Sequence, residues 1–124
     1  MKFFVIAILA AFTACQDYNS NTNDVEKYSK VTLTGSADFT PSYYILQQRC
    51  TNCHSSSIHS AWASYTKEQD WIDQGLVVKG DPDSSKAIYR IINHGSTDSN
   101  MPLGMGPLPN DEYQQLVDWV TNIP

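Results

Sequence analysis

Five consecutive residues, Cys50-Thr51-Asn52-Cys53-His54, decide how the rest of the chain is interpreted. The C-x-x-C-H spacing is typical of the covalent attachment of c-type haem. Two thiols separated by two residues can add to the two vinyl groups of the macrocycle, and the adjacent imidazole can then bind the iron. We therefore predict one covalent haem c held by Cys50 and Cys53, with His54 as the first iron ligand.

The same cysteine pair has three other interpretations. It could form a structural disulfide, a thioredoxin-like redox pair, or half of a zinc site with His54, His59 or His94. A thioredoxin-like fold places the motif after a strand in a βαβ framework, whereas the pattern before Cys50 is helical. A zinc site would need further paired ligands, and the chain has no second C-x-x-C. Haem attachment is the interpretation that the sequence favours.

The sixth position of the iron needs a ligand from elsewhere in the chain. Met101-Pro102 lies in a loop rich in glycine and proline, and Pro102 favours an extended conformation at Met101 that would present the thioether. We predict Met101 as this ligand. Met105, between two glycines, and His94, at the end of a predicted helix, remain alternatives, as does an open position. The site would then comprise iron held by His54 and Met101.

The first fifteen residues indicate export. Lys2 precedes an apolar run, Phe3 to Phe12, that is too short to span a bilayer, and Thr13-Ala14-Cys15 follows it. We interpret residues 1–14 as a lipoprotein signal peptide and Cys15 as the lipidated N-terminus of the mature protein. Ordinary export with a free thiol at Cys15, and an uncleaved anchor, are the alternatives. Residues 15–39 would form the lipidated N-terminus and a tether, because residues 16–30 are polar with no apolar period.

Length and charge limit the remaining possibilities. A chain of 124 residues suits one small domain and excludes the large enzyme folds. Thirteen Asp and Glu residues against eight Lys and Arg give a net charge of −5, which argues against nucleic-acid binding. We expect a monomer whose partners are redox proteins.

The mature chain is expected to be all-α, and we place its domain at residues 40–124. Helices are predicted to start at Thr40-Pro41, at a Thr66–Gln69 capping box, at Asp81-Pro82 and at Asn110. The second is expected to stop at Gly75 and the third near His94, and residues 95–109 form a loop. A short strand at residues 31–34 is a weaker expectation. So few helices with such long loops imply that a cofactor fills the centre.

Four blocks in order make residues 40–124 similar to class I c-type cytochromes. They are Cys50–His54, Gly80-Asp81-Pro82-Asp83-Ser84-Ser85, Met101-Pro102 and Asp118-Trp119-Val120. Small monohaem bacterial cytochromes carry C-x-x-C-H, G-D-P-x-x-S, M-P and a final D-W-[VI] in this order. The resemblance implies a small helical domain wrapped around one covalent haem, with His54 as the proximal and Met101 as the distal ligand. It also leaves room for Tyr89 or Arg90 to reach a haem propionate, although a solvated helix face explains both.

The sequence therefore predicts an exported, lipid-anchored monohaem cytochrome c that carries single electrons and is not an enzyme. It would face the periplasm of a bacterium. Gln16 after Cys15 favours the outer membrane if the cell is Gram-negative. Two alternatives stay open. One is a haem sensor or peroxidase-like protein with a labile sixth ligand, which would use His94 or Asp98. The other is a non-haem exported redox lipoprotein that uses the C-x-x-C pair.

Overall fold

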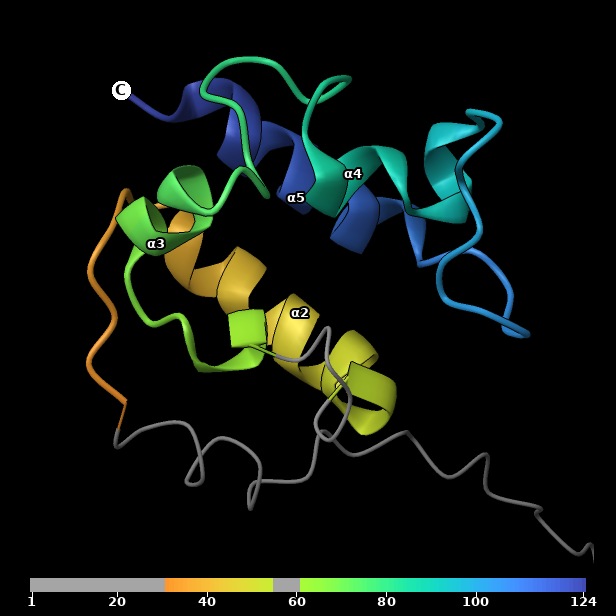
Figure 1. Cartoon of the computed structure of the whole chain (residues 1–124), viewed down its shortest axis with the longest axis horizontal. Coiled ribbons are helices and arrows are strands. Elements are labelled where there is room, and N and C mark those ends of the chain that lie inside the picture. Colours follow the sequence, from red (N-terminus) through yellow and green to blue (C-terminus); the bar gives the residue numbers. More distant parts are fainter. Residues whose placement is uncertain (1–30, 55–60) are drawn as a thin grey trace, which may run out of the picture.

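The computed structural model describes residues 31–54 and 61–124. The secondary-structure elements of this part of the chain are helices joined by turns and loops (Figure 1). The elements in chain order are α2 (Phe39–His54), the 3₁₀ turn η1 (Ala61–Ser64), α3 (Glu68–Asp73), α4 (Lys86–Tyr89), the 3₁₀ turn η2 (Ile92–His94) and α5 (Asn110–Asn122). Two isolated bridges, Thr34–Lys67 and Ile91–Met101, are the β-structure of this part of the chain. The all-α prediction is confirmed at this level, whereas the strand predicted at residues 31–34 is wrong, because it is reduced to one bridge.

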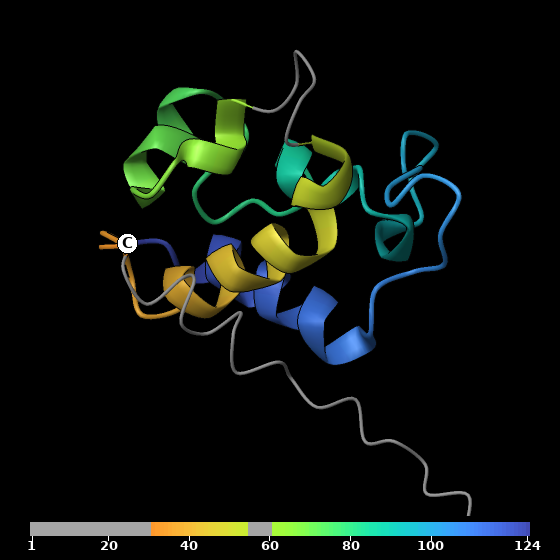
Figure 2. The same cartoon turned by 90° about the horizontal axis from the view of Figure 1, so that it is seen from below.

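Helices α2 and α5 lie side by side and run in opposite directions (Figures 1 and 2). At one end the rings of Phe39 and Trp119 are 5.5 Å apart, and at the other Arg49 forms a bidentate ion pair with Glu112. Between them the Ser42 hydroxyl donates to the carbonyl of Gln115 across the interface at 3.2 Å. This pair of helices forms the base on which the rest of the domain is assembled.

The hydrophobic core lies between this helix pair and the segments that cover it. The α5 side chains Leu116, Trp119 and Val120 are fully buried, as the one-face spacing of its apolar residues requires. The core as a whole comprises Phe39, Tyr43, Leu46, Trp71, Val77, Ile88, Ile91, Leu108, Leu116, Trp119, Val120 and Ile123.

Helix α2 begins at Phe39, slightly before the Thr40-Pro41 start that the sequence predicts. The Ser42 N–H donates to the carbonyl of Asp38, so the cap lies before Phe39. Pro41 still falls within the first turn, where its missing N–H costs no intrahelical hydrogen bond.

Helix α3 contains Trp71 as predicted, and the chain leaves it at Gly75, whose φ of +66° suits glycine. The capping box is wrong. The residue before the helix, Lys67, makes no side-chain cap, and Gln69 donates instead to Asp73 one turn later. The Glu68 N–H is satisfied by the carbonyl of Thr34 at 2.8 Å, so a distant backbone partner replaces the local cap.

The helix expected from Asp81-Pro82 is much shorter than predicted. Residues 82–84 form turns and α4 begins only at Lys86. The Ser85 hydroxyl donates to the carbonyl of Asp81 and accepts from the N–H of Val78, and such side-chain bonds compete with helical ones. Ile91 then adopts an extended conformation and ends the helical path. The last helix, by contrast, opens at Asn110 as predicted.

The packed part of the chain extends back at least to Leu33, which contacts the core. Gly35 is required there, because a Cβ atom would lie 2.7 Å from both Glu68 and Phe39. Next to it, Ser36 donates from its hydroxyl and its N–H to the carboxylate of Glu68. Residues 33–36, which the sequence assigns to the tether, therefore pack against the domain.

The predicted signal peptide, Cys15 and residues 16–30 lie outside the described residues. In the part of the chain that is described, no helix has the length and apolar character needed to cross a bilayer.

Candidate functional site

A cavity of about 520 Å³ lies beside the C-terminal half of α2. This volume falls within the range of about 300–1,000 Å³ that is usual for sites of small molecules and cofactors. Its walls come from α2, η1, α3, α4 and the chain around Met101, and most of the lining side chains are apolar or aromatic. The lining residues are Leu46, Cys50, His54, Ala61, Trp62, Tyr65, Trp71, Gln74, Leu76, Lys86, Ala87, Arg90, Ile91 and Met101.

The two cysteines of the motif lie near the C-terminal end of α2, and both are free thiols. Cys50 is half-buried and lines the cavity. Burial, followed by the charge of Cys53, raises the pKa of Cys50 to about 11 although Arg49 acts in the opposite direction. Cys53 is exposed and is not one of the lining residues.

His54 is the last residue of α2 and lines the same cavity as Cys50. Its Nδ1 atom is buried and has no hydrogen-bond partner among the described residues. An orphaned polar atom of this kind is uncommon in a folded protein. The ring lies 5.5 Å from that of Trp62, so an aromatic wall flanks the imidazole.

Met101 reaches the cavity because its backbone is fixed on both sides. Its N–H donates to the carbonyl of Arg90 at 2.9 Å, and its carbonyl accepts from the N–H of Ile92 at 2.7 Å. These bonds form the Ile91–Met101 bridge. A residue 47 positions after His54 in the sequence thereby contributes to the same cavity.

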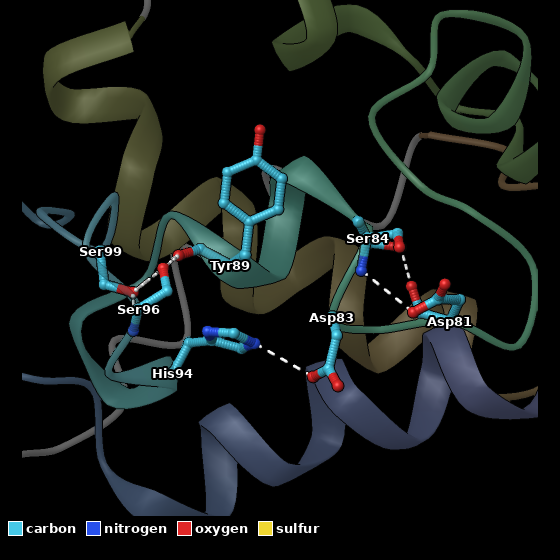
Figure 3. A network of polar contacts seen from close by, with 8 residues as sticks. Asp81, Asp83, Ser84, Tyr89, His94, Ser96 and Ser99 are labelled. Atoms are coloured by element: carbon cyan, nitrogen blue, oxygen red, sulfur yellow. Dashed lines mark hydrogen bonds and ion pairs between the residues drawn. The ribbon is translucent and has the colours of Figure 1, made fainter.

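The loop before Met101 is held by a small set of hydroxyl hydrogen bonds (Figure 3). Ser96 and Ser99 both donate to the carbonyl of Tyr89, at 3.1 and 2.7 Å. Their pattern fixes the start of the loop to the end of α4. This anchoring explains how a segment rich in glycine can hold Met101 in a defined position.

The two competing ligands lie elsewhere. Met105 is 61% exposed and does not line the cavity. His94 does not line it either, and Figure 3 shows its ring directed at Asp83, with the Nε2 and Oδ1 atoms 3.1 Å apart. Of the three candidates for the distal ligand, the structure brings only Met101 together with Cys50 and His54.

Comparison of the chain with protein-family models, curated proteins and solved structures found no match. The site must therefore be judged on its own chemistry. Two thiols lie on one helix, and one of them, Cys50, lines the apolar cavity together with a thioether and an imidazole that has an orphaned nitrogen. These residue types are a donor set that fits a c-type haem. No cluster of three or more His, Cys, Asp and Glu side chains that could hold a metal ion occurs within residues 31–54 and 61–124.

Sequence reasoning missed much of the cavity wall. Trp62 lies in η1 and Tyr65 follows it, in a region where the sequence predicts no helix. Lys86 and Arg90 also line the cavity, and their spacing of four residues in an apolar helix pattern was a signal that they share a face.

The turn beside this site has one perturbed carboxylate. The side-chain hydrogen bond from Ser84, together with that from its backbone N–H, holds the pKa of Asp81 below its usual range. Figure 3 shows Ser84 and Asp81 facing each other across this turn. Asp83 contributes, after burial, to a raised pKa at Tyr113 of α5.

Proposed function

We propose that this protein is an exported, lipid-anchored monohaem cytochrome c that carries single electrons between redox partners. The observation that carries the proposal is the cavity that Cys50, His54 and Met101 share. Cys50 and His54 come from one helix and Met101 from a distant loop. A cavity of that size with those donors, in a small domain, suits a buried cofactor.

Each residue would have a distinct role. Cys50 and Cys53 would hold the haem through thioether bonds, and His54 and Met101 would bind its iron. The bound haem supplies a one-electron couple between ferrous and ferric iron. The thioether of Met101 is a soft ligand that favours the reduced state and raises the potential. The aromatic wall of Trp62, Tyr65 and Trp71 would limit access of water.

A thiol–disulfide function for the C-x-x-C pair has less support. Reactive cysteines have a lowered pKa and commonly lie at the N-terminus of a helix, where the dipole stabilises the thiolate. Here the pair lies near the C-terminal end of α2, and burial raises the pKa of Cys50 to about 11. Both features disfavour a nucleophilic thiolate at neutral pH.

A haem sensor or peroxidase-like activity would use a labile sixth position and a nearby acid–base group. His94 is directed at Asp83 and is not one of the cavity-lining residues, and Asp98 is exposed. Neither position favours this alternative over electron transfer. Binding of carbon monoxide to the reduced protein at neutral pH would favour it.

The membrane part of the proposal rests on the sequence. Cys15 would carry the lipid, the protein would face the periplasm, and residues 16–30 would separate the domain from the membrane. Replacing Cys15 with serine should move the protein from the membrane fraction to the soluble fraction. Retention in the membrane fraction would count against the lipid anchor.

A haem stain of the denatured, purified protein tests the central proposal, because covalently bound haem survives denaturation. We expect the wild-type band to stain and the Cys50→Ser/Cys53→Ser band to remain unstained at equal loading. A wild-type band without stain would refute the proposed function and favour the non-haem alternative.

A further inference from the structure

The chain that follows Met101 is held at a second point, separate from the hydroxyl anchors that precede Met101. Residues 103–107 are exposed, and they form a loop at the edge of the domain that returns to it at Leu108 (Figure 1). Leu108 is 6% exposed and belongs to the hydrophobic core. Two glycines lie within the loop, so its own backbone is permissive. The contacts of Leu108 therefore determine where the loop ends.

The carboxamide of Asn93 holds Leu108 through both of its polar groups. The Nδ2 atom of Asn93 donates to the carbonyl of Leu108 at 2.9 Å, and its Oδ1 atom accepts from the N–H of Leu108 at 2.8 Å. The side-chain amide thus pairs with Leu108 as a backbone peptide group would. Pro107 and Pro109 flank Leu108 and have no N–H, so Leu108 supplies the only backbone N–H of residues 107–109.

Adjacent residues hold the two ends of the loop. Ile92 donates its N–H to the carbonyl of Met101 at 2.7 Å, and the next residue, Asn93, binds Leu108. Both belong to η2, so a single turn of 3₁₀ helix fixes the start and the end of the loop. Closing a flexible loop costs conformational entropy, and the hydrogen bonds of Asn93 offset part of that cost.

Without these hydrogen bonds, Leu108 would be held mainly by the packing of its side chain. Apolar packing is not directional, whereas two hydrogen bonds to one peptide unit also fix the direction of the backbone. Met101 begins the loop and lines the cavity, so a change in the path of the loop affects the placement of its thioether. We propose that Asn93 is a positioning residue, which closes the loop at Leu108 and so keeps the Met101 thioether on the iron; the inference rests on the proposed function.

Imidazole binding to the purified ferric holoprotein tests this role, because imidazole takes the sixth position of the iron only when Met101 leaves it. The apparent affinity for imidazole is proportional to the fraction of protein in which Met101 has left. The titration is followed by the loss of the thioether-to-iron band. Removing both hydrogen bonds in Asn93→Ala should raise this fraction, and with it the apparent affinity, by about tenfold.

Asn93→Asp is a second variant of almost the same shape. It keeps an acceptor for the N–H of Leu108 but replaces the donor with an oxygen that faces the carbonyl of Leu108. We expect this variant also to bind imidazole more tightly than the wild type. Asn110→Ala is the matched control, because it removes the same amide from an exposed residue two positions beyond Leu108, and it should bind imidazole as the wild type does.

Glu68→Ala separates positioning from a general loss of stability. Glu68 lies on α3, at the other end of the domain from the loop, and its carboxylate accepts a hydrogen bond from the buried Trp119 (Figures 1 and 2). Its replacement should lower the urea midpoint, yet leave the affinity for imidazole close to that of the wild type. The Asn93 variants should show a large gain in imidazole affinity relative to their change in urea midpoint.

Two results would overturn the inference. One is a wild-type affinity for imidazole in both Asn93 variants, and the other is an equal gain of affinity in Asn110→Ala or in Glu68→Ala. If Asn93→Ala does not accumulate as holoprotein, Asn93→Asp decides the question. A wild-type protein without covalent haem would refute the proposed function, whereas haem-loaded Asn93 variants that bind imidazole as the wild type does would refute this inference alone.

Discussion

Replacing Glu68 with alanine should remove the polar centre that joins three separate segments of the domain. Glu68 is 8% exposed, and its Oε1 atom accepts a hydrogen bond at 2.8 Å from Nε1 of Trp119, which is fully buried. The same carboxylate accepts the hydroxyl of Ser36 at 2.5 Å and its N–H at 3.2 Å. It therefore connects α3 to α5 and to the chain before α2.

The expected loss of stability depends on whether each hydrogen-bond donor can find another partner once the carboxylate is removed. The Trp119 N–H would stay buried without a partner, at a cost of about 1–3 kcal/mol. The two donors of Ser36 are partly exposed and can turn to water, so their loss adds about 0.5–1.5 kcal/mol. Together they predict that Glu68→Ala lowers the free energy of unfolding by about 2–4 kcal/mol.

The assay is urea unfolding of the purified holoprotein, followed by circular dichroism. With a typical urea dependence of about 2 kcal/mol per molar for a domain of this size, the midpoint should fall by about 1–2 M. Glu112→Ala is the matched control, because the side chains of its ion pair with Arg49 are 38% and 23% exposed, more than Glu68, and the pair should contribute about 0–1 kcal/mol. Equal losses in the two variants would refute the view that burial makes Glu68 important. A double-mutant cycle with Trp119→Phe should recover a favourable coupling energy between Glu68 and Trp119.

Three further predictions concern the site and the turn beside it. The thioether-to-ferric-iron charge-transfer band should disappear in Met101→Ala and persist in Met105→Ala, and the opposite pattern would transfer the ligand role. A Cys50→Ser/Cys53→Ser protein should lose cooperative thermal unfolding by circular dichroism, because an apolar cavity of about 520 Å³ would lose the cofactor that stabilises it; a cooperative melt like that of the wild type would contradict this. Because the pKa of Asp81 is lowered in the folded state, its stabilising contribution is present above its unfolded value and is lost as the pH falls through the folded one. Asp81→Ala should therefore weaken the protein at neutral pH and reduce its loss of stability below about pH 4, measured as urea midpoints across that range.

The candidate site could be predicted where its chemistry depends on residue types at fixed spacing. Cys50 and His54 are four positions apart on one helix, and this local spacing suffices to place both on the cavity. From the sequence, Met101 could be preferred to Met105 only because Pro102 follows it. The structure adds the Ile91–Met101 bridge, which holds Met101 at the cavity and could not be predicted from the sequence. Lys86 and Arg90, at the two ends of α4, line the same cavity.

Local signals failed where distant backbone groups compete with them. The capping box at Thr66 is displaced because Thr34, far away in the sequence, satisfies the N–H of Glu68. The long helix from Asp81 is shortened because the Ser85 hydroxyl donates to the Asp81 carbonyl, which the first turn of a helix would use. The Glu68–Trp119 bond spans 51 positions, and no periodicity in the sequence could indicate it.

The visible spectrum of the purified exported protein, recorded in the oxidised and reduced states, tests the central claim most directly. We predict the spectrum of a low-spin c-type haem, with sharp bands on reduction and a thioether-to-iron band on oxidation that is lost in Met101→Ala. A protein that accumulates with both Cys50 and Cys53 present and shows no haem absorption in either state would contradict the account.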